Sequence, residues 1–158
     1  MTELLKLTWE NIDDVCNKVS DLITKVNYKP EIIISIGRGG LIPSRILSDR
    51  LNVSNIYMYN VKLYTGINAR KSKPTIEFFN CDVQNKSVLL VDDILDSGIT
   101  VNAVLEDLLK KRPKAVRTAT LYCREDSISK PTFYGSIVRK GLWIEFPWEK
   151  VETEKENK

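Results

Sequence analysis

The segment from Val88 to Thr100, VLLVDDILDSGIT, carries the side chains best suited to chemistry. Four apolar residues lead into the adjacent carboxylates of Asp92 and Asp93, at the predicted carboxyl end of a buried strand, where open α/β sheets bind ligands. The stretch 96–100 (DSGIT) then opens onto a predicted helix. Its backbone N–H groups, its two hydroxyls and the positive end of that helix could together hold one phosphate group.

The two acids narrow the choice of ligand. Asp92 and Asp93 would repel a bare polyanion, but they suit a ligand that presents hydroxyl groups or a divalent metal ion to them. A sugar phosphate with free hydroxyls, bound together with magnesium, satisfies both halves of the segment. The alternative interpretation is a strand–turn–helix connection without a ligand. Such a connection would need only one Asp or Ser, as a helix cap, rather than all of these polar residues.

A second candidate loop is 37–40 (GRGG), which ends the apolar run 32–36. Its small residues expose backbone amides and Arg38 adds a cation, so the loop could hold a second anionic group. Alone, the pattern also fits a glycine-rich turn. Two other nucleotide-binding motifs are absent. A Walker A loop would need a GK[ST] sequence, which the chain lacks, and a dinucleotide fingerprint that starts at Gly37 would need its third glycine at position 42, which is Ile42.

Two residue types exclude further classes of chemistry. The chain has no histidine, so a histidine general base, a catalytic triad with histidine and a His-ligated zinc are all excluded. Its three cysteines, Cys16, Cys81 and Cys123, are far apart and form no CxxC pair. A structural zinc site and a disulfide framework are therefore not expected.

The segment Val88–Thr100 resembles, without a gap, the phosphoribosyl pyrophosphate (PRPP) signature of type I phosphoribosyltransferases. That signature is an apolar strand, two acids, two apolar residues and Asp-Ser/Thr-Gly-x-Thr. The 37–40 loop is similar to the pyrophosphate loop of the same family, and the two occur in the family's usual order. The resemblance implies transfer of 5-phosphoribose from PRPP to a purine base, with release of pyrophosphate and with Mg2+ as the cofactor.

The resemblance also implies a role for individual residues. Asp92 and Asp93 would contact the ribose and the metal, and Asp96 would accept the ring proton of the base. The 5-phosphate would be held by Asp96, Ser97, Gly98, Ile99 and Thr100. Pyrophosphate would be held by Arg38 and Gly39, and by Arg70 and Lys71 of a basic loop at 65–74. That loop corresponds in position to the family's flexible catalytic loop, although Tyr64-Thr65 departs from the usual Ser-Tyr pair.

The base would be bound by residues near the carboxyl end of the chain. Residues 143–149 (WIEFPWE) resemble the closing segment of xanthine-guanine and related 6-oxopurine enzymes. Trp143 would stack on the purine, and backbone carbonyls around Ile144 would accept hydrogen bonds from it. Arg124 stands where those relatives place a lysine that donates to the purine oxygen, and its longer, planar fork makes the replacement more than conservative.

The elements that must position these residues follow from apolar periodicity. Helices are expected where apolar residues recur at three- and four-residue steps, at 9–28, 41–51 and 100–111. Strands are expected at 32–36, 56–63, 75–79, 87–91, 116–122, 133–138 and 142–146. This alternation indicates an α/β fold, a central parallel sheet flanked by helices. The resemblance adds a small C-terminal hood, from about 124–149.

Length and composition indicate one ordinary globular domain. The 158 residues are 42% hydrophobic and 28% charged, and we expect one domain at 1–150 with a polar tail at 151–158. The net charge of 24 − 21 = +3 is mild, which argues against a nucleic-acid partner. No run approaches the about 20 apolar residues that span a membrane, so we expect a soluble, cytoplasmic protein. The resemblance suggests a homodimer.

The expected function is a purine phosphoribosyltransferase of nucleotide salvage. Its partners would be PRPP and a 6-oxopurine base, that is hypoxanthine, guanine or xanthine. Two alternatives stay open. The base could be adenine, or the chain could be a PRPP-sensing regulator that binds nucleic acid on the same fold, although its low net charge counts against the regulator.

Overall fold

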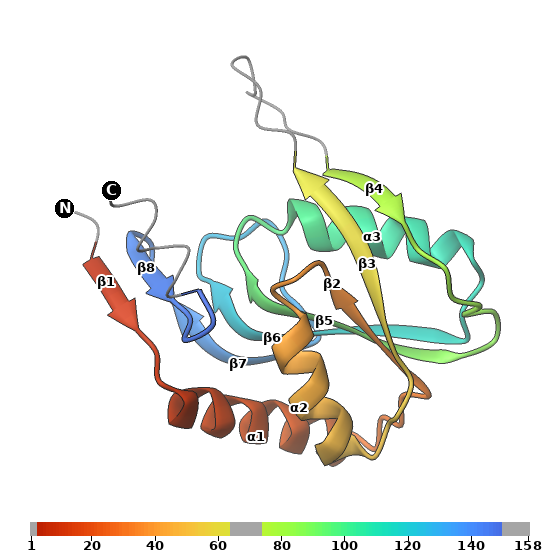
Figure 1. The fold of residues 1–158 in the computed structure, drawn as a ribbon, viewed down its shortest axis with the longest axis horizontal. Helices are drawn as coiled ribbons and strands as arrows, with labels where there is room; N and C mark the ends of the chain where they lie inside the picture. The colour runs from red at the N-terminus through yellow and green to blue at the C-terminus, as the bar shows by residue number, and fades with distance from the viewer. Residues whose placement is uncertain (1–2, 64–73, 150–158) are drawn as a thin grey trace.

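The computed structural model describes residues 3–63 and 74–149, and within them the chain forms the predicted α/β fold (Figure 1). A six-stranded central sheet has the strand order β4-β3-β2-β5-β6-β7. Neighbouring strands run parallel except β3 and β4, which are antiparallel. These strands are β2 (Ile32–Ile36), β3 (Ile56–Leu63), β4 (Pro74–Phe78), β5 (Ser87–Leu95), β6 (Ala115–Arg124) and β7 (Phe133–Val138).

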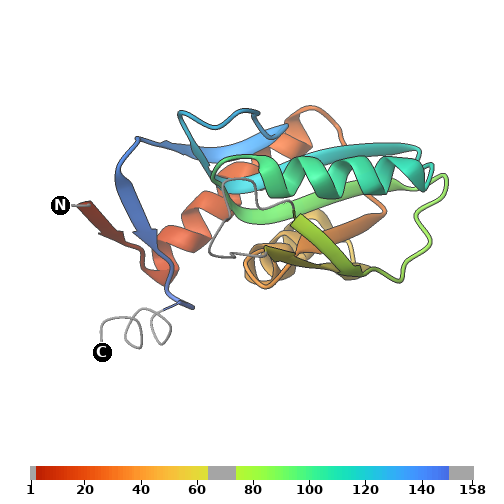
Figure 2. The same cartoon turned by 90° about the horizontal axis from the view of Figure 1, so that it is seen from above.

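Helices cover both faces of this sheet (Figures 1 and 2). Helices α1 (Trp9–Lys25) and α2 (Leu41–Leu51) pack on one face, and α3 (Ile99–Lys110) packs on the other. Strand β2 is therefore buried at all five positions, which explains why its sequence is almost wholly apolar. In the described residues, no helix is long and apolar enough to span a membrane.

The chain reverses its direction of winding between β2 and β5. From β2 it passes through α2 to β3 on one side, whereas from β5 it passes through α3 to β6 on the other side. The connections after β2 and β5 thus diverge, although the two strands are hydrogen-bonded neighbours. A crevice opens at such a switch point, at the carboxyl ends of the strands, and both predicted motifs lie there.

The described hood differs from the predicted one in two respects. We predicted that 133–138 and 142–146 both belong to it, but β7 (Phe133–Val138) pairs with β6 and forms an edge of the central sheet. Strand β8 (Leu142–Glu145) pairs instead with β1 (Glu3–Lys6), which the sequence pattern did not reveal. Every residue of β1 is exposed and its partner lies at the far end of the chain, so no local periodicity marks it.

Strand β5 is longer than predicted and changes where the acids lie. It continues to Leu95 because its backbone stays paired with β6 as far as Cys123. Asp92 and Asp93 therefore lie inside the strand rather than after it. A rigid strand fixes their positions more firmly than a loop would.

Candidate functional site

The carboxyl ends of β2 and β5 enclose a cavity of about 380 Å3, and residues from both predicted motifs line it. The β2 side contributes the glycine-rich loop with Arg38, and the β5 side contributes the acid pair and the phosphate loop. The lining residues are Ile36, Gly37, Arg38, Gly39, Val61, Asp92, Asp93, Ile94, Leu95, Asp96, Ser97, Gly98, Thr100 and Val101. Predicted residues from two separate segments of the sequence thus face one space.

The candidate phosphate loop, residues 96–100, leads into α3, which begins at Ile99. Gly98 has a φ of +91°, and a β-carbon there would lie 2.6 Å from Ser129 Oγ, so both its backbone and its surroundings favour glycine. Gly98, the N-cap residue of α3, has no side chain to cap the helix, and the first turn carries no acid. The Ile99 N–H donates to Ser97 Oγ at 3.3 Å, and the N–H groups that follow it in the first turn point toward the side of the helix where an anion binds.

A segment that the sequence did not single out supports this loop. The chain from 125 to 130 follows β6 and lies against the phosphate loop. The Ile128 backbone N–H donates to the Ser97 carbonyl at 3.1 Å. Ser129 Oγ pairs with Asn102 Oδ1 of α3 at 3.2 Å. These contacts tie the phosphate loop to the end of β6, where Arg124 lies.

The acid pair is held by backbone N–H groups at the floor of the cavity. Asp92 Oδ1 accepts from the Asp93 N–H at 3.0 Å, and Asp93 Oδ1 accepts from the Ile94 N–H at 2.6 Å. Burial and then the charge of Asp93 raise the pKa of Asp92 well above its ordinary value. Burial, with a contribution from Glu149, raises the pKa of Asp93 to about 6. Two carboxylates that resist full ionisation suit a site that a cation completes.

The glycine-rich loop lies directly against these acids. A β-carbon on Gly39 would lie 2.6 Å from Asp93 Oδ2, so only a glycine lets the loop backbone approach the carboxylate so closely. The Gly37 N–H donates to the Tyr59 carbonyl of β3 at 2.8 Å, which fixes where the loop begins. Arg38 is exposed and lines the cavity, as an anion-binding cation should.

Two smaller cavities, of about 190 and 160 Å3, share Asp96, Arg124 and Trp143 in their walls. Trp143, on β8, is 56% exposed, so its ring face is available to a planar ligand. Ile144 lines the second of these cavities and is itself buried. The structure thus brings all three predicted base-binding residues to one place beside the predicted proton acceptor.

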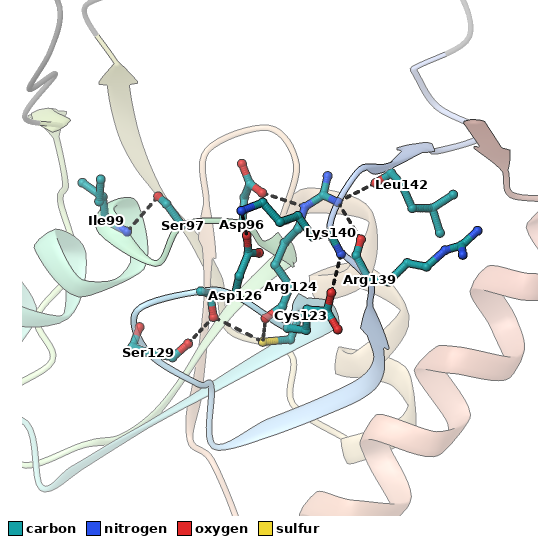
Figure 3. A network of polar contacts seen from close by, with 12 residues as sticks. Asp96, Ser97, Ile99, Cys123, Arg124, Asp126, Ser129, Arg139, Lys140 and Leu142 are labelled. Atoms are coloured by element: carbon teal, nitrogen blue, oxygen red, sulfur yellow. Dashed lines mark hydrogen bonds and ion pairs between the residues drawn. The ribbon is translucent and has the colours of Figure 1, made fainter. Parts of the chain in front are cut away.

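Arg124 makes hydrogen bonds on both sides of these two cavities, which together are the candidate base cavity (Figure 3). Its Nε donates to Asp96 Oδ1 at 2.7 Å. Its Nη1 donates to the carbonyl oxygens of Leu142, at 2.5 Å, and Arg139, at 3.4 Å. The sequence placed Arg124 and Asp96 in the site, but it gave no sign that they contact each other.

Sequence reasoning missed Glu149 as a site residue. This carboxylate lines the same cavity as Asp93, Arg124 and Trp143, and its Oε2 accepts from the Phe146 N–H at 3.2 Å. An acid at the end of the closing segment was the available signal. Arg70 and Lys71, predicted to bind pyrophosphate, lie outside the described residues.

Comparison with known proteins agrees with this geometry. The model of the phosphoribosyl transferase domain matches residues 8–152. A xanthine-guanine phosphoribosyltransferase from Chromohalobacter salexigens is 32% identical over 122 residues, which is 74% of this chain and 67% of that protein. The crystal structure of a purine phosphoribosyltransferase from Pyrococcus horikoshii has 32% identity and a TM-score of 0.80, covering 92% of this chain and 93% of that one.

A third similar structure contains a bound nucleotide. A hypothetical protein from Neisseria gonorrhoeae, solved with bound ppGpp, has 27% identity and a TM-score of 0.85. The alignment covers 99% of this chain and 95% of that one. The family model and the full-length structural matches agree with the two motifs that meet at the switch point, and this chain belongs to the phosphoribosyl transferase domain family.

Proposed function

We propose that this chain transfers the 5-phosphoribosyl group of PRPP to a 6-oxopurine, as a salvage enzyme. The bond between C1 of the ribose and the pyrophosphate oxygen breaks, and a bond forms from C1 to the ring nitrogen N9 of the base. The products are a nucleoside monophosphate and pyrophosphate. One observation carries the proposal: a phosphate loop, an acid pair and a base cavity adjoin one another at a single sheet edge.

The described residues suggest how the parts of PRPP are held. Ser97, Thr100 and the first N–H groups of α3 bind the 5-phosphate, and the acid pair faces the ribose hydroxyls. Arg38 and the backbone at Gly39 bind pyrophosphate, and their fixed charge stabilises the negative charge that grows on it as the bond breaks. Arg70 and Lys71, outside the described residues, would add to that charge.

Asp96 is the group that we propose accepts the proton of the base. It lies on the wall shared by the PRPP cavity and both base cavities, so its carboxylate can reach the base without leaving the phosphate loop. Trp143 stacks on the purine and Arg124 donates to the 6-oxygen. Adenine would present an amino donor to the Arg124 donor, and such a mismatch disfavours it as a substrate.

Magnesium is the cofactor that best fits the acid pair. Asp92 and Asp93 offer hard carboxylate oxygens, and the described residues contain no cluster of three or more His, Cys, Asp or Glu side chains that could enclose a metal. Mg2+ characteristically uses one or two carboxylates and completes its shell with water and substrate oxygens. When bound, Mg2+ would supply positive charge against the departing pyrophosphate.

A parallel assay of bases tests the proposed function. The protein, Mg2+ and PRPP are incubated separately with hypoxanthine, guanine, xanthine, adenine, uracil and orotate, and the nucleotide and pyrophosphate are quantified. We expect turnover of at least one 6-oxopurine. Turnover of adenine at least ten times faster than of hypoxanthine and guanine would overturn the base assignment. Salt-sensitive binding of RNA or DNA without pyrophosphate release would favour the regulator instead.

The ppGpp-bound neighbour suggests an inhibitor of the same site. This nucleotide combines a guanine with phosphate groups, the two chemistries that the base cavity and the phosphate loop offer. We propose that ppGpp occupies this cavity in our chain and competes with PRPP. The test is a set of initial rates at several PRPP concentrations, in which ppGpp should raise the KM for PRPP and leave kcat unchanged.

Three further proposals concern the setting of the enzyme. We propose that residues 1–150 form one domain followed by a polar tail, and that the protein acts as a homodimer, which sedimentation velocity would test. We also propose that it works in the cytoplasm. All three cysteines are free thiols, a state that a reducing compartment maintains.

A further inference from the structure

The Arg124 side chain joins three segments that meet only at the base cavity. It leaves the end of β6, reaches Asp96 of the phosphate loop, and reaches the carbonyls of Leu142 and Arg139 in the hood (Figure 3). The Arg124 side chain is only 14% exposed, whereas that of Asp96 is 72% exposed. The buried, multiply bonded partner is therefore Arg124, and the exposed partner whose position depends on it is Asp96.

The ion pair of Arg124 with Asp96 leaves one donor group and one acceptor atom without a hydrogen-bond partner among the described residues. Within the described residues, Arg124 Nη2 has no hydrogen-bond partner, and neither does the second carboxylate oxygen of Asp96. Both side chains line both base cavities. A planar guanidinium that binds a carboxylate through Nε keeps its remaining N–H groups in a fixed direction relative to that carboxylate. The two unused groups thus form one unit.

We infer that Arg124 is a positioning residue for Asp96, so that recognition of the 6-oxygen and acceptance of the base proton depend on one side chain. The inference rests on the proposed function and deepens it. A 6-oxopurine protonated at N7 carries an acceptor, O6, beside a donor, N7–H. Arg124 Nη2 donates to O6 while the second oxygen of Asp96 accepts from N7–H. As N9 bonds to the sugar and pyrophosphate leaves with the bonding electrons, the N7 proton passes to Asp96.

A lysine in place of Arg124 could not do both tasks in this way. Its ammonium is a single charged point on a flexible stem, so contact with the base would move it relative to Asp96 and to the hood carbonyls. Arg124→Lys should therefore preserve charge and still permit donation to O6, while it loses the fixed placement of Asp96. A residue that only binds the base would affect KM, whereas loss of positioning affects kcat.

The test is a double-mutant cycle on the full chain, with hypoxanthine and saturating PRPP. We expect Arg124→Lys to lower kcat by about 10²-fold, since a misplacement of about 1 Å can have that effect. Asp96→Asn should lower kcat by roughly 10²–10⁴-fold in the parent chain. In the Arg124→Lys background, Asp96→Asn should lower kcat by less than about tenfold, because the effects of coupled residues are not additive.

Controls separate positioning from misfolding. Arg139→Lys makes the same chemical change in the hood, on a side chain that pairs with Glu3, and should keep kcat within about twofold. PRPP binding by calorimetry should be unchanged in the Arg124→Lys variant. An unchanged kcat in Arg124→Lys, or an Asp96→Asn penalty that is equal in both backgrounds, would overturn the inference. A parent chain that converts no purine would instead overturn the proposed function.

A measurement on the unaltered protein provides an independent test. 9-Deazahypoxanthine carries N7–H beside O6, whereas 7-deazahypoxanthine has a carbon at that ring position. If Arg124 and Asp96 bind O6 and N7–H together, the first compound should inhibit at a concentration at least about tenfold lower than the second, since the lost bond leaves a polar group unpaired. Equal inhibition constants would contradict the inference.

Discussion

The backbone of Gly39 and the carboxylate of Asp93 are in direct contact across the switch point of the sheet. A β-carbon on Gly39 would lie 2.6 Å from Asp93 Oδ2 and 2.9 Å from its carboxyl carbon. Asp93 cannot move away easily, because its Oδ1 accepts the Ile94 N–H from inside β5. The proposed pyrophosphate loop and the proposed metal ligand therefore share one tightly packed boundary.

Gly39→Ala tests this contact. The added methyl group should lower stability by about 1–3 kcal/mol, as overpacking commonly does, and should raise the KM for PRPP. In an Asp93→Ala background the same change should have little effect on stability, because the carboxylate it collides with is gone. Urea denaturation of the two single variants and the double variant measures this coupling. An equal loss in both backgrounds would show that the contact does not carry the effect.

Asp93→Asn tests the electrostatic state of the acid pair. Burial raises the pKa of Asp93 from 3.8 to about 6, so the folded chain binds more protons than the unfolded chain in that interval. The stability conferred by protonated Asp93 is full below pH 3.8 and is lost as the pH rises through about 6. At pH 8 the buried charge then destabilises the metal-free fold by up to about 3 kcal/mol.

The Asn variant lacks that charge. Without Mg2+ and in the presence of a chelator, it should be more stable than the parent at pH 8 by on the order of 1–3 kcal/mol, and nearly equal to it at pH 4. Urea titrations at both pH values measure the difference. Asp14→Asn, on the exposed face of α1, is the matched control. An Asn variant that is less stable than the parent at pH 8 would contradict the prediction.

Trp143→Ala tests the base cavity. Stacking of an aromatic side chain on a base is worth about 1–3 kcal/mol, so the KM for hypoxanthine should rise about tenfold while the KM for PRPP stays unchanged. Trp9→Ala is a close control, because both tryptophans are 56% exposed but Trp9 packs near Trp148, outside the walls of the three cavities described above. If both variants alter the KM for the base equally, Trp143 has no special role.

The parts of the fold and of the candidate site that the sequence predicts are those formed by residues next to one another in the chain. Strand β2 and helix α2 each follow from a short pattern of apolar residues, and both form at the predicted positions. The segment 96–100 leads from β5 into α3 and lines the main cavity. The contact of Arg124 with Asp96 and the approach of Glu149 to Asp93 join residues far apart in the chain. The first contact follows from the pairing of β5 with β6, in which Leu95 lies opposite Cys123, and the second from the cavity that Asp93 and Glu149 share. Neither arrangement is recorded in a local periodicity.

Strand β1 is a further non-local feature, and it bears on the base cavity. It pairs with β8, the strand that carries Trp143, and the Leu7 N–H donates to the Glu145 carbonyl at 3.0 Å. Lys6 Nζ lies 3.4 Å from Glu145 Oε1. The Glu145 side chain is only 10% exposed, whereas that of Lys6 is 69% exposed. The pair therefore anchors a nearly buried carboxylate of the hood to the amino-terminal strand.

Lys6→Met should loosen the hood and weaken base binding. A partly exposed ion pair contributes up to about 1 kcal/mol, so we expect the KM for hypoxanthine to rise by up to about fivefold, with the KM for PRPP unchanged. Lys86→Met removes a comparable pair, with Glu31 at 3.5 Å, beside the amino end of β5 and away from the hood. Steady-state kinetics of both variants distinguish a local effect from a general one. Equal changes in the two variants, or a change confined to PRPP, would show that β1 does not position the hood.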